Sequence, residues 1–303
     1  MDGIIVINKP KGFTSFDIVA IMRKLCNIKK IGHSGTLDPM ATGVLPILIG
    51  KATKLQTMLQ NSQKEYIAEF KLGITTDSED ITGKVLTKKS VEAKKENIQA
   101  VLSDFRGKIK QIPPMYSAVQ KDGVRLYNLA RQGIEVEREP REVTIYKLEL
   151  LSYDEVGHIG KILVKCSKGT YIRTLCADIG EKLACGATLT SLERTFAASF
   201  AISDSITLDE AKIRSQNGTL VDKLIPIDRL FKDYSSLTVT AAQGVRLKNG
   251  GALFLDRTDA KNAPDSTIFR TYDDEGTFLG LSIVKQKSGE LSRLTKWTEV
   301  YEK

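Results

Sequence analysis

The residues with the clearest potential for chemistry lie in one loop-like segment, residues 30–43. Two glycines flank His33 there, and Asp38 precedes Pro39. A proline holds the residue before it in an extended or turn geometry, and glycines let a ligand approach the backbone closely. A fixed carboxylate suits a reaction that needs one acidic group. From the spacing alone, an Asx turn at Asp38 and a loop histidine without a role explain the same residues.

Several other reaction classes lack their sequence motifs. The chain has no G-x-x-x-x-G-K-[ST] phosphate loop and no G-x-G-x-x-G after a strand. It also has no G-x-S-x-G elbow and no H-x-E with P-C-x-x-C deaminase signature. ATP hydrolysis, dinucleotide redox chemistry, serine hydrolysis and metal-assisted deamination are therefore not expected. What remains is chemistry that uses one carboxylate and needs no cofactor.

Cysteine and histidine usage argues against a metal site. The four cysteines form no C-x-x-C pair, and the chain has only two histidines. The first residues do not resemble a signal peptide, and no apolar run approaches the roughly 20 residues that span a bilayer. With reduced cysteines, these features predict a cytoplasmic protein without metal, cofactor or membrane contact.

Charge is unevenly distributed along the 303 residues. The net charge is +8, yet residues 233–303 hold ten basic and ten acidic residues, so the excess lies in residues 1–232. Two segments, residues 1–60 and 84–111, each carry +5. This pattern predicts a large domain with an anionic partner, followed by a small neutral domain after a joint at residues 227–233.

The elements around the candidate loop mix strands and helices. Alternating apolar residues over 66–72 predict a half-buried strand, and a capping box at residues 14–17 predicts the start of a helix. The apolar face of residues 98–105 predicts a helix closed by Gly107. After residue 233, short strands with glycine-containing turns indicate a small β-barrel.

Five motifs, in order along residues 3–200, resemble those of the TruB family of tRNA pseudouridine synthases. The candidate loop is similar to the family's active-site motif and reads GHSGTLDP, then ATGVL after one residue. The other motifs are NKPKGFTS at 8–15, KEY at 64–66, PPMYSA at 113–118 and KGTYIRTL at 168–175. One departure lies outside the catalytic motifs: before Phe200 the chain reads Ala-Ala-Ser, where the family usually has a glycine.

The resemblance implies an α+β fold with two domains. Residues 1–232 correspond to a pseudouridine synthase catalytic domain, with a central mixed or antiparallel sheet flanked by helices. Within it, residues 113–141 are similar to the family's RNA-gripping insertion. Residues 233–303 resemble the small, β-barrel-like PUA domain that binds RNA in this family.

The resemblance also implies a reaction, the isomerisation of uridine to pseudouridine at position 55 in the T-loop of tRNA. The target base is flipped out of the folded loop, and Asp38 is the implied catalytic residue. The bond between N1 and C1′ breaks, and the uracil rejoins the sugar through C5. Addition of Asp38 to the sugar, addition to C6 of the base and assisted elimination remain alternatives.

Seven further residues match positions that contact substrate in the family. Arg173 pairs with the aspartate and favours its charged form. Tyr66 stacks on the target base, Tyr171 and Leu192 line the pocket, and His33 fills the space that the flipped base leaves. Lys9 and Lys54 contact phosphate or a loop. Each of these residues also has an ordinary explanation, as core packing or as a surface charge.

The implied partner is the T-arm of tRNA, and a monomer is the default expectation. The alternative function is a tRNA-binding or tRNA-folding protein in which catalysis is absent or secondary. The combination of Asp38 with Tyr66 and Arg173 favours the enzyme, because a pure binding protein has no use for it. A relative that works in a guide-RNA complex is less favoured, because residues 113–141 match the stand-alone bacterial type.

Overall fold

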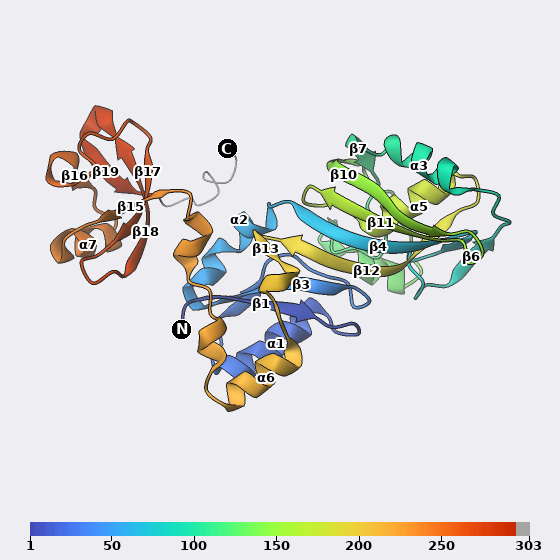
Figure 1. Ribbon diagram of the computed structural model, residues 1–303, viewed down its shortest axis with the longest axis horizontal. Helices are drawn as coiled ribbons and strands as arrows, with labels where there is room; N and C mark the ends of the chain where they lie inside the picture. Colours follow the sequence, from blue (N-terminus) through green and yellow to red (C-terminus); the bar gives the residue numbers. More distant parts are fainter. Residues whose placement is uncertain (295–303) are drawn as a thin grey trace.

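A long mixed sheet runs through the N-terminal part of the chain (Figure 1). The structure, a computed structural model, describes residues 1–294. The main path of this sheet has, in spatial order, β14 (Ile206–Thr207), β1 (Gly3–Lys9), β3 (Thr42–Ile49), β12 (Ala187–Ala197), β4 (Lys64–Leu72), β11 (Ile159–Cys166), β10 (Arg141–Asp154) and β7 (Gly107–Gln111). Two short strands join it: β2 (Ile31–His33) pairs with β3, and β13 (Phe200–Ala201) pairs with β12. Parallel and antiparallel pairs both occur, so the predicted mixed sheet is confirmed.

The parallel contact between β3 and β12 joins the two halves of the sheet at the end of the candidate loop. Thr42 and Gly43 lie opposite Glu193 and Arg194. The backbone of Gly43 has φ +102°, and a Cβ atom there would overlap the carbonyl oxygen of Arg194. Only glycine permits this close approach, so the strand behind the loop dictates the residue at its end.

Two pairs of helices cover the sheet. Helices α1 (Ser15–Cys26) and α6 (Leu208–Gln216) pack on the half that contains β1 and β3. Helices α3 (Lys95–Ser103) and α5 (Ile172–Lys182) pack on the half that contains β4, β10 and β12. Each buried Ile, Leu, Val or Phe side chain in these two cores contributes roughly 1.5–3 kcal/mol. The predicted α+β class is confirmed.

The helix starts and ends test the local sequence predictions. The capping box of α1 is confirmed, because the Asp17 N–H donates to the Thr14 hydroxyl at 3.1 Å and the Thr14 N–H donates to the Asp17 carboxylate at 2.8 Å. For the helix predicted over residues 98–105, the predicted end at Gly107 is wrong: α3 ends at Ser103, and Gly107 begins β7. Tight backbone turns end the helix before this glycine, which has φ +84° at the entry into the strand.

Strand β4 shows the burial that the alternating sequence predicts. Tyr66, Ala68, Phe70 and Leu72 are buried, and the residues between them are more exposed. Strand β4 lies between β12 and β11 near the middle of the sheet; its Tyr66 reaches the pocket described below, whereas Ala68, Phe70 and Leu72 pack in the core.

A second, five-stranded sheet follows. Its spatial order is β15 (Ser235–Thr238), β17 (Ile268–Tyr272), β18 (Phe278–Lys285), β19 (Glu290–Arg293) and β16 (Leu253–Phe254), with helix α7 (Ala241–Lys248) beside it. Within residues 1–294 no pairing connects β16 back to β15, so the predicted barrel is not confirmed. Part of the predicted domain, residues 295–303, lies outside the described residues.

The division at residues 232 and 233 stays a prediction. Residues 227–231 form the short 3-10 helix η4 (Ile227–Phe231) at the expected joint. Its Phe231 is buried and stacks on Phe278 of β18, with ring centroids 6.4 Å apart. The same apolar cluster includes Val44 of β3, so the two sheets share part of one core.

The remaining elements are short. They are η1 (Gly50–Leu55), α2 (Gln56–Gln60), β5 (Ile74–Thr76), β6 (Val85–Lys88), β8 (Gln120–Lys121), β9 (Val124–Arg125), α4 (Leu126–Arg131), η2 (Ile202–Asp204), η3 (Leu220–Lys223), η5 (Leu255–Arg257) and η6 (Gln286–Ser288). Among the described residues, no helix has both the length and the apolar character to cross a membrane.

Candidate functional site

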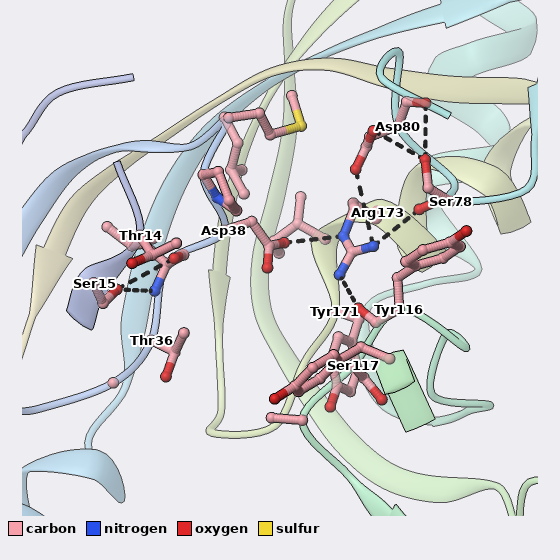
Figure 2. A pocket seen from close by; sticks show the side chains of 18 of the residues that line it. Thr14, Ser15, Thr36, Asp38, Ser78, Asp80, Tyr116, Ser117, Tyr171 and Arg173 are labelled. Carbon is pink, nitrogen blue, oxygen red and sulfur yellow. Dashed lines mark hydrogen bonds and ion pairs between the residues drawn. The ribbon is translucent and has the colours of Figure 1, made fainter. Parts of the chain in front are cut away.

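A pocket of about 1230 Å³ gathers segments that are far apart in the sequence (Figure 2). The start of α1, the candidate loop, β4, the start of α5, β12 and residues 116–131 all contribute to its lining. Six of the eight predicted site residues line it: Asp38, His33, Tyr66, Tyr171, Arg173 and Leu192. The two predicted lysines, Lys9 and Lys54, do not.

Asp38 and Arg173 form an ion pair in this pocket, as the resemblance implied. The distance from Nε of Arg173 to Oδ2 of Asp38 is 3.0 Å. The carboxylate side chain is 40% exposed, whereas the guanidinium side chain is only 5% exposed. A buried cation therefore holds an accessible carboxylate in place at the pocket.

Arg173 is held on all sides by partners besides Asp38. It lies in the first turn of α5, and its two Nη atoms donate to the backbone oxygens of Ser78 at 2.9 Å and Tyr116 at 2.8 Å. Asp80 lies 3.9 Å from Nη1 and accepts hydrogen bonds from Ser78 Oγ and Thr82 N. The planar guanidinium can satisfy these directions at once, so it connects residues 113–141 to the candidate loop that carries Asp38.

The loop that carries Asp38 is tied to the start of α1 on both sides of the carboxylate. The Leu37 N–H donates to Ser15 Oγ at 2.8 Å, and the same hydroxyl donates to the Leu37 carbonyl at 3.2 Å. On the other side, Lys9 Nζ donates to the carbonyls of Pro39 at 3.4 Å and Phe13 at 2.7 Å. These bonds fix the backbone immediately before and after Asp38.

Lys9 corrects one sequence expectation. It is fully buried, with its ammonium against backbone carbonyls, so it cannot contact phosphate, and of its two expected roles the loop contact remains. Burial lowers the pKa of Lys9 to about 8, although the charge of Asp38 opposes this shift. Lys54 is exposed on η1, so a phosphate contact outside the pocket stays a prediction for it.

Tyr66 has a buried cationic neighbour that sequence reasoning missed, Arg194. Burial raises the pKa of Tyr66 to about 12, so its hydroxyl is neutral near pH 7. Arg194 is fully buried close to Tyr66, and it donates to the carbonyls of Val44 at 2.8 Å and Gly35 at 3.1 Å. The sequence signal that could have placed Arg194 at the pocket is its position two residues after Leu192, on the same face of one strand.

Lys64 is a third buried cation at the pocket, after Arg173 and Arg194. Its ammonium donates to the carbonyls of Gln60 at 2.8 Å and Ser62 at 2.7 Å. Burial, and secondarily the charge of Arg194, lower its pKa to about 8.

His33, Tyr171 and Leu192 shape the rest of the pocket. His33 lies on β2, a strand within the segment that the sequence indicated as a loop, and burial with the charge of Arg194 lowers its pKa. A neutral, flat imidazole could stack in the space that a flipped-out base leaves, which is the role expected for His33 from the sequence. Gln111 holds the backbone of Tyr171 by two hydrogen bonds, of 2.8 and 3.0 Å, and Leu192 supplies an apolar wall.

The described residues hold no cluster of metal ligands. Nowhere in residues 1–294 do three or more His, Cys, Asp or Glu side chains come together as a metal site would require. The arrangement around Asp38 is that of a partly accessible carboxylate, paired with a buried arginine, beside a cavity lined by aromatic and aliphatic side chains as well as by polar and charged ones.

Comparisons with known proteins show the family of the chain. Residues 23–172 match the N-terminal domain of TruB family pseudouridylate synthase, and residues 173–232 match the C-terminal domain of tRNA pseudouridylate synthase B. A tRNA pseudouridine synthase B from Clostridium perfringens is 43% identical over 97% of this chain and 99% of its own length. The enzyme of the same name from Dehalococcoides mccartyi is 43% identical over 93% of this chain and 92% of its own length.

Solved structures show the same fold. A Cbf5–Nop10–Gar1 complex contains a chain with a TM-score of 0.69 and 25% identity, over 99% of this chain and 87% of that one. An H/ACA ribonucleoprotein bound to a substrate RNA contains another, with a TM-score of 0.67 and 23% identity, over 99% of this chain and 81% of that one. With family matches over most of its length and relatives more than 40% identical along nearly all of it, the chain belongs to the TruB family of pseudouridylate synthases.

Proposed function

We propose that this protein isomerises uridine to pseudouridine in tRNA, at position 55 of the T-loop. The observation that carries the proposal is the ion pair of Asp38 with the buried Arg173 inside the large pocket. The relatives named tRNA pseudouridine synthase B support the tRNA substrate, and the T-loop position comes from the resemblance to their family.

The reaction rearranges one nucleoside without net oxidation or hydrolysis. The Asp38 carboxylate is the nucleophile or the base at the reacting nucleoside, and the buried Arg173 holds it in place through the ion pair. The N1–C1′ bond breaks, the uracil turns within the pocket, and a C5–C1′ bond forms. The proton displaced from C5 is lost and N1 gains one, so the product is an isomer of the substrate.

The surrounding residues supply the grip on the flipped base. We assign Tyr66, Tyr171 and Leu192 to the walls around the uracil and His33 to the space it leaves in the RNA. Extruding the base costs a few kcal/mol, and stacking on aromatic side chains recovers about 1–3 kcal/mol per base.

Residues 113–141 and 233–303 are the proposed RNA-gripping parts. In the insertion, the guanidinium groups of Arg125 and Arg131 lie 5.9 and 5.6 Å from the ring centroid of Tyr127 at the pocket. We propose that this group of side chains contacts the T-arm. We propose that the C-terminal sheet, as a PUA-like unit, makes a second contact with the RNA. A monomeric state and a cytoplasmic location stay predictions from the sequence.

The test is to incubate the purified protein with an unmodified tRNA transcript in the presence of EDTA and then map pseudouridine. The proposal expects stoichiometric pseudouridine at position 55 alone. A tRNA that is bound but unmodified would favour the alternative, a tRNA-binding or tRNA-folding protein. Product at other positions would keep the reaction and refute the T-loop assignment.

A further inference from the structure

Phe16 is an exposed aromatic residue at the pocket without a part in the chemistry above. It lies in the first turn of α1, lines the same pocket as Asp38, and is 64% exposed. Removing a large apolar side chain from water lowers the free energy. Its exposure beside a substrate pocket therefore points to a partner surface that covers it.

A fixed guanidinium accompanies the ring. The Cζ atom of Arg23 lies 5.8 Å from the centroid of Phe16, within the range of a cation–π interaction. The Nη2 atom of Arg23 donates to the carbonyl of Ile31 at 3.2 Å, which holds the guanidinium against the strand before the catalytic loop. Because Phe16 keeps most of its surface exposed, Arg23 covers only part of the ring.

Hydrogen bonds connect the backbone next to Phe16 to the loop that carries Asp38. The capping box of Thr14 and Asp17 fixes the helical turn that carries Phe16, and the neighbouring Ser15 makes two hydrogen bonds with Leu37. The ring is therefore presented at a set position relative to Asp38, which follows Leu37. A contact at Phe16 would position the RNA relative to the reacting carboxylate.

We propose that Phe16, with Arg23 behind it, is a stacking platform for a nucleobase next to the target uridine. Flipping a base out of a folded loop unstacks its neighbours, and an exposed aromatic ring can stack on any base. The platform thus stabilises the extruded form of the RNA without contacting the target base. This inference rests on the proposed function, because it takes a flipped uridine in the pocket as given.

The test is a mutant cycle between the protein and the RNA. Phe16→Ala should lower kcat/KM for a T-arm RNA about tenfold, and Phe16→Trp should retain most of the wild-type value. Two further substrates carry an abasic site on the 5′ or the 3′ side of the target. On the abasic substrate that lacks the base stacked on Phe16, the kcat/KM values of wild type and Phe16→Ala should differ less than twofold, because the stacking partner is absent.

Tyr146→Ala is the matched control, since Tyr146 is a half-exposed aromatic residue on β10 that does not line the pocket. It should leave kcat/KM within twofold. A tenfold loss from Phe16→Ala that persists on both abasic substrates would overturn the platform, as would an unchanged value on the intact RNA. Should wild type form no pseudouridine, the proposed function fails, and the same cycle measured on RNA affinity still decides the stacking contact.

Discussion

The Nε atom of Arg173 lies 3.0 Å from Oδ2 of Asp38, and the two side chains differ sharply in exposure. The arginine is almost fully buried and also donates to two backbone carbonyls, whereas the carboxylate is accessible from the pocket. The cation is thus held by several partners, and the carboxylate that it orients faces the pocket. Preorganisation of this kind avoids reordering charged groups during the reaction.

Replacement of this arginine by lysine tests whether its shape is needed as well as its charge. Arg173→Lys keeps a cation but cannot match Asp38 and the carbonyls of Ser78 and Tyr116 together. We expect kcat to fall about 100-fold, equivalent to about 2.7 kcal/mol at about 1.36 kcal/mol per factor of ten. Single-turnover rates at saturating tRNA measure this.

The control on the same helix is Lys182→Met, because Lys182 is half-exposed and pairs with Asp104 on the surface. It should change the rate less than twofold. Thermal unfolding of both variants separates a catalytic loss from a folding defect. If Arg173→Lys folded normally and retained its rate, the guanidinium geometry would have no role.

Lys9 and Lys54 give a paired prediction about phosphate contacts. Lys9→Met should lower the isomerisation rate, since it removes hydrogen bonds to the carbonyls of Phe13 and Pro39. It should leave the salt dependence of tRNA affinity unchanged, because its ammonium is buried. Lys54→Met should reduce the slope of log affinity against log salt by about one unit if the exposed lysine contacts a phosphate.

Binding measured from 50 to 200 mM salt for both variants decides between these roles. A flattened slope for Lys9→Met would place its ammonium near RNA after all. An unchanged slope for Lys54→Met would remove Lys54 from the RNA surface.

Asp178 predicts a dependence of stability on pH. It lies on α5 one turn after Thr174, whose hydroxyl donates to the Glu79 carboxylate at 2.6 Å. Burial first, and then the charge of Glu79, raise the pKa of Asp178 to about 7. The folded state therefore keeps a proton that the unfolded chain releases near pH 4, and this stabilisation is lost as the pH rises through about 7.

Asp178→Asn mimics the protonated form at every pH. The variant and wild type should have similar free energies of unfolding at pH 4, and the variant should be more stable by roughly 1–2 kcal/mol at pH 8. Urea unfolding at several pH values measures the difference. Asp222→Asn is the control, because it makes the same substitution at an exposed position. A difference for Asp178→Asn that is constant from pH 4 to 8 would contradict the buried carboxylate pair.

The sequence predicted those parts of the fold and site that local patterns encode. The capping box before α1 and the alternation in β4 are short-range signals, and both are confirmed. The candidate loop and the start of α5 carry Asp38 and Arg173 within compact motifs, and the resemblance of these motifs to the TruB family is what implied their pairing.

Long-range contacts could not be predicted in the same way. Arg194 reaches the carbonyls of Gly35 and Val44, more than a hundred residues earlier in the chain, and no local period indicates this. A single lysine is ordinarily assigned to the surface because burying a charge is costly. At Lys9 the compensating carbonyls come together only in the folded chain. The closure of the C-terminal strands likewise depends on pairings that turn residues do not specify.

The most direct measurement of the central claim is single-turnover pseudouridine formation by Asp38→Asn, with tRNA affinity measured in parallel. Asparagine has nearly the same shape but cannot be a carboxylate nucleophile or base, so the rate should fall below detection while affinity stays within about threefold. Asp77→Asn removes the charge of another pocket carboxylate, one that accepts from the Lys84 N–H, and should keep at least a tenth of the rate. An Asp38→Asn protein that still converts uridine at a tenth of the wild-type rate or faster would contradict the account.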